Sequence, residues 1–244
     1  MLPLKDNIPY RHTPYAVYTI VGVNALVFLL QMGMSQEQMI QLFHILGVVP
    51  ARYFQAEWAA WMGYPETFVL PFFTHMFLHS GFFHFLFNMW VMWIFADNVE
   101  DVMGPFRFVM FFLLCGLGAL ATHMFFNMDS KIPVVGASGA IAGVMGAYFI
   151  LYPHARVVTL IPIFIFPYII ELPAVIFLGI WFLSQVSTGL FANGAAQGGG
   201  GVAWWAHAGG FVAGILLLPL FRSNERCYYC YDRSRDEDKT FSFR

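Results

Sequence analysis

Residues 134–148 read VVGASGAIAGVMGAY, a stretch without a charged side chain. Glycine recurs in it every three or four residues, at positions 136, 139, 143 and 146. On a helix this spacing lines small residues along one face, where they let two helix backbones approach closely. A second stretch, AHAGGFVAG at 206–214, carries Gly210 and Gly214 four residues apart. The two stretches predict a pair of tightly packed helices in an apolar environment.

The composition of the whole chain excludes most classes of soluble protein. Of its 244 residues, 59% are hydrophobic and only 11% are charged, whereas soluble domains carry about 25% charged residues. A net charge of −2 gives no general attraction for nucleic acid, and three cysteines cannot build a disulfide framework. The composition therefore predicts a protein that crosses the lipid bilayer several times.

Six apolar stretches approach the length of about 20 residues that a membrane-spanning helix needs. None contains Asp, Glu, Lys or Arg. We therefore predict an all-α fold, a bundle of six transmembrane helices over 15–221, between an N-terminal tail at 1–14 and a disordered C-terminal tail at 222–244. The expected spans are 15–32, read as a retained signal anchor, 82–96, 108–126, 132–152, 172–191 and 202–221.

Basic residues in the connecting segments indicate the orientation. Ten of the twelve Lys and Arg residues fall on one side of the expected spans, and only Arg52 and Lys131 fall on the other. Because cytoplasmic loops carry the excess of basic residues, we expect both termini in the cytoplasm of a multi-pass protein of a bacterial inner (plasma) membrane.

Three connections are more than short turns. Residues 33–81 predict short amphipathic elements in the outer membrane interface. The apolar run within 156–171 contains Pro162 and Pro167, which make an uninterrupted spanning helix unfavourable, so we expect it to skim the inner surface. The loop NGAAQGGGG at 193–201 is either a lid or a flexible linker.

Polar side chains inside the expected spans are candidates for function, because each needs a partner in the bilayer. Ser138 and His207 lie near the outer ends of two spans. His84 and Asn88 lie four residues apart on one face of a third. One layer of the outer leaflet could therefore hold all four.

This combination suits nucleophilic catalysis. A serine hydroxyl needs a base to take its proton, and the His207 imidazole is a suitable base for Ser138. A helix N-terminus near Ser138 and donors from Asn88 and His84 would stabilise an oxyanion. With every acid expected in a loop or tail, the pair would work as a dyad. Taken singly, a serine in a glycine-rich helix or a buried histidine also fits a packing role.

Other possible sites have weaker support. Cys227 and Cys230 have the spacing of a zinc or redox motif, but zinc needs four ligands, and two reduced thiols in an aromatic belt are the alternative. His75 and His79 could bind a metal, or cap and pack a helix. Cys115 is expected in the core. We predict neither a metal nor a cofactor.

The chain resembles the rhomboid family of intramembrane serine proteases at several motifs. HSGFFHFLFN carries His79, His84 and Asn88 in the family's H-x4-H-x3-N pattern, and GASG matches its GxSG pattern. The stretch from His207 through Gly210 to Gly214 matches H-x2-G-x3-G. The likeness extends over nearly the whole of 15–221.

The resemblance implies a serine endopeptidase that cleaves transmembrane protein substrates near the outer membrane face. By position, Ser138 is the nucleophile and His207 the general base. Asn88, His84 and the Ser138 backbone N–H form the oxyanion hole, with motif support from Gly136, Gly139, His79, Gly210 and Gly214.

One departure concerns the residue that orients the histidine. Some members stack it on a tyrosine four residues after the serine, where this chain has Ala142, so Tyr148, Trp204 or Trp205 is expected to orient His207. The alternatives to a protease are a non-catalytic rhomboid-like adaptor that binds client transmembrane helices, and a metal-dependent site on the histidines of the second expected span.

Overall fold

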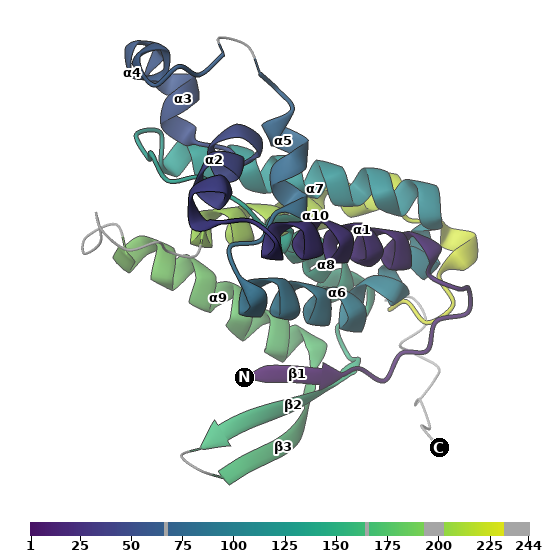
Figure 1. Cartoon of the computed structure of the whole chain (residues 1–244). Coiled ribbons are helices and arrows are strands. Elements are labelled where there is room, and N and C mark those ends of the chain that lie inside the picture. The colour runs from purple at the N-terminus through teal and green to yellow at the C-terminus, as the bar shows by residue number, and fades with distance from the viewer. Residues whose placement is uncertain (66–67, 164–165, 193–202, 232–244) are drawn as a thin grey trace.

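The computed structural model describes residues 1–65, 68–163, 166–192 and 203–231. Six helices of 14 residues or more form its main body (Figure 1). Four of them, α1, α7, α9 and α10, are long and apolar enough to cross a membrane. The predicted polytopic helical membrane fold is confirmed, although α6 ends in acidic residues and α8 is short. The bounds are α1 Tyr15–Met32, α6 Phe82–Met103, α7 Pro105–Phe126, α8 Ser138–Leu151, α9 Ala174–Ala192 and α10 Trp204–Phe221.

Helix α8 lies at the centre, packed against α6, α7 and α10. Eleven of its 14 residues are buried. At about 1.5 Å per residue it is roughly 21 Å long, well short of a hydrocarbon core of about 30 Å. The helix expected from residue 132 begins only at Ser138, because Gly136 has a φ of +124° and Val134 pairs with Val48 in an isolated bridge.

Glycines set the distance between α8 and α10. A methyl group added to Gly214 would lie 1.9 Å from the carbonyl oxygen of Gly143, and one added to Gly210 would lie 2.0 Å from that of Gly139. No side chain fits such a gap. The close approach predicted from the glycine spacing is therefore confirmed.

Acidic residues extend α6 beyond the expected span. The helix continues to Met103 and ends at Gly104, whose φ is +79°, so the expectation that every acid lies in a loop or tail was wrong. Glu100 is buried and accepts hydrogen bonds from the backbone N–H groups of Ala16 and Val17, at 3.0 and 2.8 Å. It thereby satisfies donors that the first turn of α1 leaves unpaired.

A three-stranded antiparallel sheet is added to the helices. Its strands are β1 Leu2–Lys5, β2 Arg156–Ile163 and β3 Phe166–Pro173, in the order β1-β2-β3. Pro162 and Pro167 lie opposite each other in the β2–β3 hairpin. The prediction that these prolines prevent a spanning helix is confirmed, but strand formation was not foreseen.

Polar contacts attach the first strand to the bundle. The indole N–H of Trp90 donates to the carbonyl oxygen of Pro3 at 2.7 Å. The Tyr148 hydroxyl donates to the half-buried carboxylate of Asp6. Burial outweighs this bond and raises the pKa of Asp6 to about 7, so near neutral pH the carboxyl is present in both protonation states.

Short helices form the long connection before α6, as predicted. They are α2 Gln36–Leu46, α3 Pro50–Phe54, α4 Ala56–Trp61, α5 Pro71–Thr74 and the 3-10 turn His75–Phe77. Figure 1 shows α2 to α4 gathered at one end of the bundle, away from the sheet. The Ser35 side chain accepts from the Gln38 backbone N–H and so caps α2.

The cysteines differ from expectation at one point. Cys227 and Cys230 form a disulfide after the 3-10 turn Asn224–Arg226, so the expected two reduced thiols were wrong. Their Cα atoms lie 5.2 Å apart, within disulfide range. Cys115 is buried, as predicted. The loop 193–201 and the tail beyond residue 231 lie outside the described residues.

The contact between α8 and α10 leads to a first prediction. Gly214→Ala forces the two backbones apart, and we expect it to lower the free energy of unfolding by about 1–3 kcal/mol. The matched control is Gly179→Ala on α9, where no atom lies within 4 Å of the added methyl. Because alanine is the better helix former, this control should be neutral or stabilising. Thermal unfolding in detergent measures both, and equal shifts would contradict the packing argument.

Candidate active site

Ser138 and His207 meet across the contact between α8 and α10. The Ser138 hydroxyl oxygen lies 2.8 Å from Nε2 of His207. Nδ1 of the same ring lies 2.7 Å from the side-chain oxygen of Gln185 on α9. Because that oxygen can only accept, Nδ1 carries the proton and Nε2 is free to accept from the serine. Both side chains are partly exposed, so the pair can be reached by a reactant.

Ser138 is also the first residue of α8. The backbone N–H groups of a helix's first turn have no partner within the helix, and the helix dipole is positive there. Within the described residues no side chain caps this end. An anion forming beside the Ser138 hydroxyl would therefore meet free N–H donors.

His84, Asn88 and Gly136 converge beside this helix end. A methyl group built on Gly136 would lie 2.7 Å from Nε2 of His84 and 3.7 Å from the amide nitrogen of Asn88. The amide nitrogen is buried and has no hydrogen-bond partner among the described residues. Gly136 is two positions before Ser138, so the structure brings His84 and Asn88 to the serine motif.

The hydrogen bonds of His84 fix its ring tautomer. Its Nδ1 lies 3.0 Å from the Ser80 hydroxyl and accepts from the Ser80 backbone N–H at 3.4 Å. A nitrogen that accepts from a backbone N–H is unprotonated, so Nε2 carries the hydrogen. His84 therefore offers a donor on the side facing Gly136.

His79 and His75 are buried side chains in contact with other residues of the bundle. The buried His79 ring stands edge-on to Phe28, Phe85 and His84, with centroids 5.2–6.3 Å apart. Nδ1 of His75 lies 2.9 Å from the Pro71 carbonyl oxygen. The described residues contain no group of three His, Cys, Asp or Glu side chains that could hold a metal.

The surroundings of His207 differ from those expected. Of the three residues proposed to orient it, only Trp204 contacts the ring, edge-on with centroids 6.2 Å apart. Tyr148 packs against Phe95, and Trp205 stacks on Phe126.

Two residues of α9 were missed, namely Gln185 and Trp181, whose ring lies 6.0 Å from the imidazole. Gln185 is a buried amide within the expected span 172–191. A polar side chain inside an expected span is the same signal that identified Asn88.

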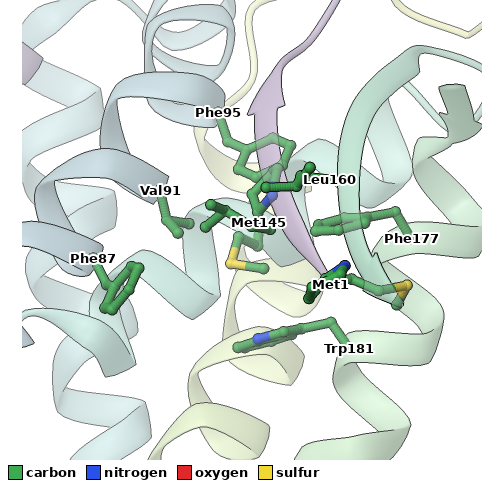
Figure 2. Close-up of a pocket in the computed structure, with 11 residues that line it drawn as sticks. Met1, Phe87, Val91, Phe95, Met145, Leu160, Phe177 and Trp181 are labelled. Carbon is green, nitrogen blue, oxygen red and sulfur yellow. The ribbon is translucent and has the colours of Figure 1, made fainter. Parts of the chain in front are cut away.

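An apolar cavity of about 410 Å³ lies between α6, α8 and α9 and is bordered by the sheet. Figure 2 shows Phe87 and Val91 of α6 on one side and Phe177 and Trp181 of α9 on the other. Trp181 also faces His207. The cavity therefore ends one side chain away from the Ser138–His207 pair.

Comparisons with known proteins all identify the same family. The family model described as Rhomboid domain matches residues 66–224. The chain is 25% identical over 209 residues to Rhomboid protein 1, mitochondrial, of Saccharomyces cerevisiae, covering 84% of this chain and 53% of that protein.

Two further relatives match shorter parts of the chain. Presenilin-associated rhomboid-like protein, mitochondrial, of Mus musculus is 29% identical over 60% of this chain and 36% of its own length. Rhomboid protease GluP of Bacillus subtilis is 39% identical over 30% of this chain and 14% of its own length. The chain thus spans about half or less of the length of these relatives.

The crowding at Gly136 leads to a second prediction. Gly136→Ala adds a methyl group that collides with the His84 ring and also strains a positive φ. Gly63 also has a positive φ, +77°, with no atom within 4 Å of an added methyl, so Gly63→Ala measures the cost of a left-handed alanine without a collision, about 1 kcal/mol. We expect Gly136→Ala to lower the thermal unfolding temperature clearly more than Gly63→Ala does. Similar losses would show that neither the collision with His84 nor the larger φ of +124° matters at Gly136.

Proposed function

The chain belongs to the rhomboid family, and we propose that it is a serine endopeptidase that cleaves the transmembrane segments of other membrane proteins. The observation that carries this proposal is the 2.8 Å separation between the Ser138 hydroxyl and Nε2 of His207. It gives a weak nucleophile a base in the correct tautomer, beside a helix N-terminus suited to an oxyanion.

In the proposed first half-reaction, the Ser138 oxygen attacks the carbonyl carbon of the scissile peptide bond while Nε2 of His207 takes the hydroxyl proton. The carbonyl oxygen becomes an oxyanion held by the Ser138 backbone N–H, the Asn88 amide and Nε2–H of His84. His207 then gives its proton to the leaving amine. The C–N bond breaks, and an ester joins the substrate to Ser138.

In the second half-reaction, water replaces the amine. His207 takes a proton from the water, whose oxygen attacks the ester carbonyl, and the same donors hold the second oxyanion. The C–O bond to Ser138 breaks, the serine recovers its proton from His207, and the new carboxyl product leaves. The dyad returns to its starting state without a cofactor in any step.

The substrate must expose its backbone to react. The carbonyl groups of an intact helix are hydrogen-bonded and surrounded by side chains, so attack needs a locally unwound segment. We propose that substrates carry helix-destabilising residues and small side chains near the cut. The cavity between α6 and α9, separated from His207 by Trp181, offers an apolar space for part of such a segment.

The orientation proposed for this reaction follows from the basic residues. With both termini on the cytoplasmic side, the N-terminus of α8 faces the opposite side of the membrane. Cleavage would then take place near the outer boundary of the substrate's transmembrane helix.

The proposal predicts that each member of the dyad is essential. Ser138→Ala removes the nucleophile and His207→Ala removes the base, so we expect each to abolish cleavage of a transmembrane model substrate by the purified protein in detergent. A fluorophosphonate probe should label the wild-type protein at Ser138 and neither variant, with unfolding temperatures near wild type. Full cleavage by Ser138→Ala would refute this mechanism, and a folded wild-type protein that neither cleaves nor labels would favour the adaptor.

The oxyanion donors give a separate prediction. Asn88→Ala removes one donor, and we expect kcat to fall by about 10²- to 10³-fold. The matched control is Asn24→Ala, which also removes a buried amide from a long helix, but one that among the described residues bonds to the Ile20 carbonyl of its own helix alone. Asn24→Ala should keep its kcat. Equal activity of the two variants in the cleavage assay would remove Asn88 from the oxyanion hole.

A further inference from the structure

We propose that Gln185 is the positioning residue for His207, holding the ring in the tautomer that activates Ser138; this inference rests on the proposed protease function. The buried Gln185 side chain comes from α9, whereas Ser138 and His207 come from α8 and α10. Its amide oxygen lies 2.7 Å from Nδ1 of His207. Three helices therefore contribute to one chain of hydrogen bonds.

The other end of the amide determines which atom faces His207. The Gln185 side-chain nitrogen donates to the Ser184 hydroxyl oxygen at 3.0 Å. That hydroxyl gives its own hydrogen to the Trp181 carbonyl oxygen at 2.6 Å, so toward Gln185 it can only accept. The amide nitrogen is thus directed to Ser184, and the amide oxygen is left for the imidazole.

The orientation of the Gln185 amide fixes the direction of each hydrogen bond between Gln185, His207 and Ser138. Nδ1–H of His207 donates to Gln185, so Nε2 accepts from the Ser138 hydroxyl. The opposite tautomer would set two acceptors against each other at Nδ1 and leave Nε2 unable to take the serine proton. Once Nε2 takes that proton, the bond from Nδ1–H to the amide oxygen becomes charge-assisted and stabilises the imidazolium.

The aromatic neighbours of His207 cannot replace this contact. Trp181 is tilted by 33° to the imidazole plane and Trp204 stands at 90° to it. These rings limit how the imidazole can move but offer Nδ1 no lone pair in its plane. In the described part of the chain, the group bonded to Nδ1 is the Gln185 amide alone.

Two substitutions of similar length test the proposal. Gln185→Met keeps the unbranched side chain but removes the acceptor, and we expect kcat to fall by about 10- to 100-fold with KM unchanged. Gln185→Glu keeps an acceptor oxygen in either protonation state, so it should recover much of that loss. The control Thr188→Val removes a hydroxyl one turn along α9 that bonds to the Ser184 backbone, and it should cleave at the wild-type rate.

A spectroscopic measurement separates this inference from the protease proposal. In full-length Ser138→Ala protein with ¹⁵N-labelled histidine, NMR should find the His207 proton on Nδ1, and adding Gln185→Met should shift the ring toward the other tautomer. A proton on Nε2 in the presence of Gln185, or an unchanged kcat in Gln185→Met, would overturn the inference. If the protein cleaves nothing but the Nδ1 proton depends on Gln185, the protease proposal fails and the positioning role stands.

Discussion

The backbone contact between α8 and α10 is the constraint on which the site depends. Gly143 faces Gly214 and Gly139 faces Gly210 so closely that a single methyl group would collide with a carbonyl oxygen. Ser138 and His207 extend from these two helices. The close approach of the two helices brings the serine hydroxyl within 2.8 Å of an imidazole nitrogen. The glycines therefore set the geometry of the pair without taking part in its chemistry.

The length of α8 explains why the serine lies at a helix end. Because α8 is almost completely enclosed by other helices, its length need not match the hydrocarbon thickness, and the chain before it can stay non-helical. Hydrogen bonds hold that non-helical segment, since the Gly136 N–H donates to the His75 carbonyl oxygen and Val134 pairs with Val48. The free N–H groups of the first helical turn are thus placed within the bundle, beside Ser138.

Sequence reasoning identified these helices and the polar residues on them because charge is scarce and glycine periodicity is strong in this chain. It did not foresee the β2–β3 hairpin, since an apolar run broken by prolines excludes a helix without specifying strand pairing. It placed the end of α6 too early, because acidic residues were taken to end a span, although no helix breaker precedes Gly104. It missed Gln185 because a search for an orienting acid passes over a neutral amide, and only the folded arrangement of α9 and α10 joins residues 22 positions apart.

Hydrogen-bond partners lower the cost of burying a polar side chain in this apolar bundle. Ionised carboxylates are costly to bury without several donors, and Glu100 is buried where two backbone N–H groups of α1 meet it. Beside His207 the described residues place the rings of Trp181 and Trp204. A neutral amide can be buried there if both of its ends are bonded, and Ser184 and His207 bond them. The scarcity of charge that marks the sequence thus favours glutamine over an acid as the third member of the site.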